Sequence, residues 1–167
     1  MDPEAETRKH IDLVGKFLNL FAIELLKRAA THDASKLREP EKSLFEKYAP
    51  QLNALTYGSP EYKENLKNLD AAVSHHYAHN KHHPEFNDIN GFSFSSLNDP
   101  IQSMDLVDIV EMICDWMAAT RRHKDGNIGR SIAINEERFK INGQLSQVFR
   151  NTSAFLEQKL AMLPGED

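Results

Sequence analysis

The chain has 167 residues, of which 40% are hydrophobic and 27% are charged. A chain of this length folds as one domain as a rule, and it buries enough apolar surface to need no disulfide or structural metal for stability. Its 20 basic and 25 acidic side chains give a net charge of −5. This balance argues against a general nucleic-acid or membrane-surface binder, because affinity for phosphate backbones and lipid headgroups comes mainly from Lys and Arg.

Cys114 is the single cysteine, which excludes an internal disulfide and a cysteine-rich zinc site. The amino-terminal residues are acidic where a signal peptide would be basic, and the early apolar stretch 17–26 is interrupted by Asn19 and Glu24. We therefore expect a cytoplasmic protein without membrane contact, built as a single domain over residues 1–167. The sequence is also compatible with a homo-oligomer.

Apolar residues recur at helical spacing through most of the chain, which predicts an all-α bundle of about five to seven helices. The first helix is expected over 6–30, with Val14 and Phe17 on its core-facing side. A charged second helix over 35–48 should end before Pro50, because the residue preceding a proline disfavours helical geometry.

The pair Ser59-Pro60 is typical of a helix start, and this third helix should run to about residue 79. Residues 80–99 lack helical periodicity and predict a long loop. Asp99-Pro100 repeats the start signal and opens an apolar central helix over 101–122. Closing helices are expected over 131–162, after a metal-site core that spans 6–122.

Five of the eight histidines fall within nine positions: His75, His76, His79, His82 and His83. Imidazole is the commonest transition-metal ligand, so this density predicts a metal site. A solvated group of surface histidines is the alternative interpretation.

His76 continues the apolar line of its helix, three residues after Val73, so it should face the core. His10 does the same at the start of its helix, four residues before Val14. A buried imidazole needs either a hydrogen-bond partner or a metal. Taken singly, each could be a core histidine bonded to a carbonyl group.

Three carboxylates could complete such a site. Asp115 lies among large apolar residues of the central helix, and buried Asp is almost always paired. Asp108 is its rival on the same helix. His32-Asp33 offers one nitrogen and a carboxylate that could bridge two ions, although Asp33 could instead cap the next helix.

The ordered set of histidines and aspartates resembles the HD-domain superfamily of metal-dependent phosphohydrolases, over roughly residues 6–122. The run 32–36 is similar to the His-Asp-x-Gly-Lys run of its cyclic-dinucleotide phosphodiesterase branch, with Ser35 in place of Gly, while the Gly-Tyr-Pro segment of that branch is absent. The pattern also resembles a family of short bacterial and phage proteins of unknown function.

The resemblance implies two divalent transition metals, drawn from Mn, Fe, Co, Ni and Zn. One ion would be held by His10, His32, Asp33 and Asp115, and Asp33 would bridge to a second ion on His76 and His82. His75 and His83 are rivals for that second ion, and Glu6 is an accessory group.

The implied activity is hydrolysis of a nucleotide or other small phosphate ester by a metal-activated hydroxide. Lys36 would neutralise and bind the phosphate, helped by Arg121, with Arg122 and Lys81 as alternatives. His83 or Glu85 would donate the proton to the leaving group. Two other functions stay open: a di-iron oxygenase of the same superfamily acting on a small organic substrate, and a non-catalytic nucleotide-binding or partner-binding helical module.

Overall fold

Every regular element is helical in the part of the chain that the computed structural model describes, which is residues 2–56, 59–91, 100–122 and 125–164. The predicted all-α class is therefore confirmed. The α-helices are α1 (Pro3–Thr31), α2 (Glu41–Asn53), α3 (Pro60–Leu66), α4 (Asp70–His79), α5 (Glu85–Ile89), α6 (Leu106–Thr120), α7 (Ile128–Phe139) and α8 (Gly143–Leu160). Short 3₁₀ helices are η1 (Ala34–Leu37), η2 (Lys67–Leu69) and η3 (Pro100–Ser103). None of the described helices combines the length and the apolar character that crossing a membrane requires.

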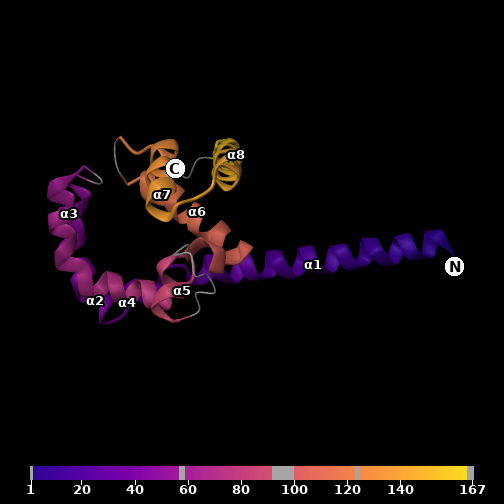
Figure 1. Cartoon of the computed structure of the whole chain (residues 1–167), viewed down its shortest axis with the longest axis horizontal. Coiled ribbons are helices and arrows are strands. Elements are labelled where there is room, and N and C mark those ends of the chain that lie inside the picture. Colours follow the sequence, from indigo (N-terminus) through magenta and orange to yellow (C-terminus); the bar gives the residue numbers. More distant parts are fainter. Residues whose placement is uncertain (1, 57–58, 92–99, 123–124, 165–167) are drawn as a thin grey trace. The chain divides into compact units, whose positions relative to one another are not determined.

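The chain forms two compact units, Met1–His32 and Asp33–Asp167. The first unit is the long helix α1 (Figure 1), which begins where the Asp2 side chain accepts a hydrogen bond from the backbone of Glu4. Within the first unit considered by itself, the predicted core-facing side of this helix is wrong, because α1 has no buried residue and Phe17 is 63% exposed. A helix alone in its unit has no second element to cover its apolar side.

The first part of the second unit packs α2 against α4 and η2. Leu52, Leu69 and Ala72 form its buried centre. The predicted helix 35–48 is wrong in its bounds, because α2 begins at Glu41 and continues through Pro50 to Asn53. The side chain of Leu52, in the last turn of α2, is buried. The predicted start at Ser59 is confirmed, since its hydroxyl accepts a hydrogen bond from the backbone of Tyr62 at 3.1 Å. The prediction of one helix from there to residue 79 is wrong, because the 3₁₀ helix η2 separates α3 from α4.

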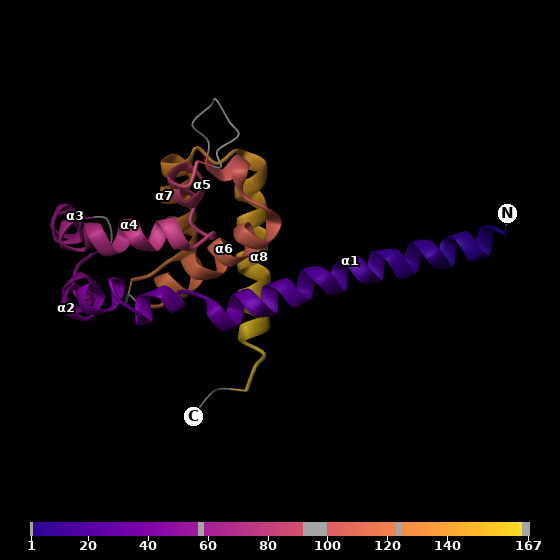
Figure 2. The ribbon, with the colours of Figure 1, turned by 90° about the horizontal axis from the view of Figure 1, so that it is seen from below.

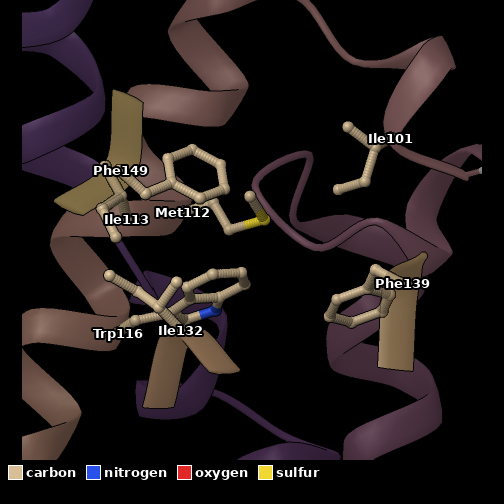
Figure 3. Packing of buried hydrophobic residues seen from close by; sticks show 7 residues of the cluster. All are labelled: Ile101, Met112, Ile113, Trp116, Ile132, Phe139 and Phe149. Atoms are coloured by element: carbon tan, nitrogen blue, oxygen red, sulfur yellow. The ribbon is translucent and has the colours of Figure 1, made fainter. Parts of the chain in front are cut away.

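Helices α6, α7 and α8 pack together and hold the larger hydrophobic core (Figure 2). Figure 3 shows its buried side chains, which are Ile101, Met112, Ile113, Trp116, Ile132, Phe139 and Phe149. Trp116 joins the helices, because its ring stacks with that of Phe139 on α7 and meets that of Phe149 on α8 edge-on.

Two predictions around the central helix need correction. The predicted loop 80–99 contains the short helix α5, and residues 92–99, including the expected cap Asp99, lie outside the described residues. Helix α6 begins at Leu106 instead of 101, because the Asp105 carboxylate accepts hydrogen bonds from the backbones of Val107 and Asp108. A local side-chain cap of this kind fixes where a helix starts.

We expect Phe149→Ala to lower the free energy of unfolding by about 4 kcal/mol, because it removes a side chain that is 1% exposed from a packed core. Phe155→Ala on the same helix is the matched control. Phe155 is 54% exposed, so its truncation should cost about 0.5 kcal/mol or less. Urea unfolding of both variants measures the difference, and equal losses would contradict this packing.

Candidate metal centre

Asp33 opens the second unit in an unusual backbone conformation. Its φ of 55° is left-handed, which Asp tolerates better than most residues. The carboxylate is bound by the Lys36 ammonium at 2.6 Å. Burial disfavours the charged form of Asp33, but the hydrogen bond from His76 and the charge of Lys36 outweigh it and hold the pKa of this carboxyl well below its usual range. Asp33 is therefore an anionic oxygen donor at neutral pH.

Glu41 holds His76 from the side opposite to Asp33. Glu41 is the first residue of α2, and it is fully buried. Its Oε2 lies 3.0 Å from His76 Nδ1 and 2.9 Å from the Ser35 hydroxyl, and its Oε1 lies 2.7 Å from His75 Nδ1. A carboxylate only accepts hydrogen bonds, so we assign a proton to Nδ1 of both histidines. The Nε2 atom of His76 then lies 3.1 Å from Asp33 Oδ1.

His82 repeats this arrangement on the other side of Asp33. It is 1% exposed, its Nδ1 lies 3.2 Å from Glu111 Oε1 on α6, and its Nε2 lies 3.5 Å from Asp33 Oδ1. Metal-binding histidines commonly donate their second N–H to a carboxylate in this way, which fixes the tautomer and the ring orientation. Helices α2 and α6 thus each supply a carboxylate that turns one imidazole toward Asp33.

His83 brings a third imidazole to the same place, with Nε2 2.9 Å from Nε2 of His76. Burial, followed by electrostatic repulsion from the neighbouring His82 and His76, lowers the pKa of His83 to about 2, although the Asp115 carboxylate opposes this shift. His83 is therefore neutral in the ion-free protein. It offers a nitrogen lone pair to the cluster.

Asp33, His76, His82 and His83 form a group that could hold a metal ion, with one ligand atom from each lying within 4.8 Å of the others. Asp33 Oδ1 and His83 Nε2 both approach His76 Nε2, at 3.1 and 2.9 Å, so three potential ligand atoms converge on one point. A divalent cation at that point would bind their lone pairs. Three nitrogens and one oxygen without sulfur suit Mn, Fe, Co, Ni or Zn. The donor set therefore fits the kind of metal that the sequence predicted.

A pocket of about 250 Å³ adjoins this cluster. His83 and Asp115 line it at the cluster, and α6 and α7 supply much of its wall. Glu85 also lines the pocket, and its carboxylate accepts a hydrogen bond from the Arg138 guanidinium. A small ligand in this pocket would lie against a residue of the metal-competent group.

The remaining predicted site residues fall in different places. His10 is exposed on α1, and His32 caps the end of that helix, so both belong to the first unit. Asp115 is half-buried in the pocket wall, whereas its rival Asp108 completes the cap of α6 with its carboxylate 3.5 Å from the backbone N–H of Asp105. The prediction that His10 and His32 hold the same ion is wrong, because α1 is one continuous helix that places them 22 residues, or about 33 Å, apart. The metal role of His32 and Asp115 stays a prediction.

The predicted phosphate-binding cations also separate. Lys36 is half-buried and bound to Asp33, next to the cluster. Arg121 is exposed at the end of α6 and is not among the residues that line the pocket, but Arg122 is. Lys81 is exposed. The position of Arg122 makes it the better placed of the two arginines for a ligand in the pocket.

Glu41 and Glu111 were not predicted to orient the histidines. Glu111 carried a usable signal, because it lies four residues before Asp115 and therefore on the same face of the central helix. Glu41 carried none, since nothing around Pro40-Glu41 indicates that its partners lie 34 and 35 residues further along the chain.

A family model described as "Family of unknown function (DUF5662)" matches residues 1–162. The chain belongs to this family. No curated protein and no solved structure matches the chain. Membership of DUF5662 supplies no activity, so the function must be argued from the cluster and its pocket.

Proposed function

We propose that this DUF5662 protein is a metal-dependent phosphohydrolase that releases phosphate from a small organic phosphate ester such as a nucleotide, and that it is related to the HD-domain superfamily. One observation carries the proposal: His83 belongs both to the metal-competent group and to the lining of the pocket. A phosphate bound at that end of the pocket would meet the group directly.

A divalent ion held by the cluster would supply a Lewis acid for the phosphate oxygens and a site that activates water. The chain's own residues prepare the position. Glu41 and Glu111 orient His76 and His82 through their Nδ1 atoms, and the hydrogen bond from His76 together with the charge of Lys36 keeps Asp33 ionised. Preorganised ligands of this kind need no rearrangement during the reaction.

Cations near the cluster suit a phosphate ester. Lys36 Nζ lies 2.6 Å from Asp33 Oδ2, so its charge is at the edge of the metal-competent group. Arg138 lines the pocket on the same side as Glu85, with which it pairs. Guanidinium and ammonium groups are the side chains that bind phosphate oxygens most strongly.

The proposal includes a second ion, as in the paired sites that the sequence resembles. The group Asp33, His76, His82 and His83 contains the ligands expected for the ion on His76 and His82, with His83 as an additional ligand. His32 and Asp115 are the ligands proposed for the other ion, which Asp33 would share; His10 is not, because 22 residues of one continuous helix separate it from His32, a rise of about 33 Å. The metal content per chain distinguishes one ion from two.

Elemental analysis of the purified protein, combined with a phosphate-release screen, tests the proposal. We expect bound transition metal, and phosphate release from at least one member of a panel of nucleoside mono-, di- and triphosphates and cyclic nucleotides. A chelator should abolish this release, and added Mn²⁺, Co²⁺, Ni²⁺ or Zn²⁺ should restore it. Undiminished activity after complete metal removal would refute a metal-dependent mechanism. Retained iron without phosphate release would favour the oxygenase.

A further inference from the structure

The pocket beside the cluster has two ends. Helices α6 and α7 are joined by a short connection, and the rings of Trp116 and Phe139 stack 6.4 Å apart. Trp116 of α6 thus lies beside the end of α7, and Arg138 on α7 pairs with Glu85, two residues after His83, so Arg138 lies at the same end of the pocket as Asp115 and the cluster. Arg122 and Arg130 lie at the other end, near the connection.

These ends are too far apart for a single phosphate. Arg130 and Arg138 both line the pocket and are separated by eight residues of α7, which corresponds to about 12 Å along a helix that rises 1.5 Å per residue. Ala119 and Ile134 line the stretch between the two ends. A ligand that fills the pocket is therefore elongated, with an apolar middle.

The far end carries positive charge. Asp125 is the acidic residue there, against the two guanidinium groups of Arg122 and Arg130. Within the described ranges, neither arginine forms an ion pair, whereas Arg138 is bound to Glu85. Guanidinium groups bind carboxylate and phosphate with paired hydrogen bonds. An anionic group is the ligand chemistry that suits this end.

We propose that the pocket selects phosphate esters whose leaving group carries a second anionic group, a carboxylate or a phosphate, on an elongated apolar spacer. The reacting phosphate would lie at His83 and Asp115, and the second anion would lie at Arg122 and Arg130. This assignment rests on the proposed function for the identity of the reacting group, but the preference for a distal anion is a property of binding alone.

Calorimetric titration of the metal-containing protein with two phosphonates tests the preference without turnover. One probe is biphenyl-4-ylphosphonate, and the other is the same compound with a carboxylate at the 4′ position. We expect the carboxylated probe to bind about tenfold more tightly, as one charge-assisted interaction implies. The double variant Arg122→Gln/Arg130→Gln should lose this preference and keep the affinity for the phosphonate that lacks the carboxylate.

Two further variants make the result specific. Lys159→Gln removes the same charge from α8, outside the pocket lining, and should keep the preference. Arg121→Gln removes it one residue from Arg122 and should also keep it, because Arg121 does not line the pocket. Equal affinities for both probes in the natural protein would overturn the inference. So would a preference that survives in the double variant.

Hydrolysis of the corresponding phosphate esters keeps the two proposals apart. Turnover of both esters with equal binding of the two phosphonates would support the hydrolase and reject the distal anion site. A preference for the carboxylated phosphonate that depends on Arg122 and Arg130, with no turnover of any ester, would support the anion site and count against the hydrolase.

Discussion

Asp33→Asn should weaken binding of a divalent ion by more than about 100-fold and abolish phosphate release. Asp33 Oδ1 lies 3.1 Å from His76 Nε2 and 3.5 Å from His82 Nε2, so this substitution removes the one anionic ligand of the group. Loss of a partner outside the ligand set already costs about 10–100-fold in metal affinity, and loss of a ligand should cost more. Competition with a coloured chelator measures the dissociation constant.

Asparagine is the better replacement because of the backbone. Asp33 has a φ of 55°, a conformation that Asn adopts readily but that costs most residues, including alanine, about 1–2 kcal/mol. Helicity by circular dichroism should be unchanged, so a loss of metal would report on the site. Asp88→Asn, at an exposed position of α5, is the matched control and should bind metal normally. Tight metal binding by Asp33→Asn would contradict the ligand set.

Features that depend on neighbouring residues could be predicted from the sequence. Ser59 was identified as a helix cap, and its hydroxyl does accept the backbone N–H three residues later. Extending the apolar line of the third predicted helix placed His76 in the core, where it is 2% exposed. Both inferences use contacts within one or two helical turns, where spacing alone fixes direction.

Features that depend on distant residues could not be predicted. The apolar stripe of α1 shows which side of that helix avoids water, but not what covers it, and its own unit leaves Phe17 exposed. Asp99-Pro100 and Asp105 are similar local signals for the start of a helix, and the burial of Val107 and Met112 agrees with a helix that starts after Asp105. The position of this helix start was needed to choose between Asp108 and Asp115 as a metal ligand, because a start at Asp105 places the Asp108 carboxylate in the helix cap.

Glu41 is the clearest example of a residue whose role depends on distant parts of the chain, and its substitution should affect both stability and metal binding. Its carboxylate accepts hydrogen bonds from His75, His76 and Ser35, and none of it is exposed. Glu41→Ala leaves three buried or half-buried donors without their acceptor, so we expect it to lower the free energy of unfolding by about 3 kcal/mol. Urea unfolding measures this loss.

Glu41→Gln separates the orienting role from the packing role. The amide keeps the shape but replaces one acceptor oxygen by an NH₂ group, so the Nδ1 proton of one histidine loses its partner. If His76 responds by moving its proton to Nε2, that proton occupies the position a metal would take, beside Asp33 Oδ1. We expect metal affinity to fall about 10–100-fold, as for other carboxylates behind metal-binding histidines. Glu39→Gln, at an exposed position two residues earlier, should leave it unchanged. If Glu41→Gln bound metal as tightly as the natural protein, Glu41 would have a role in the fold but none in orienting the metal ligands.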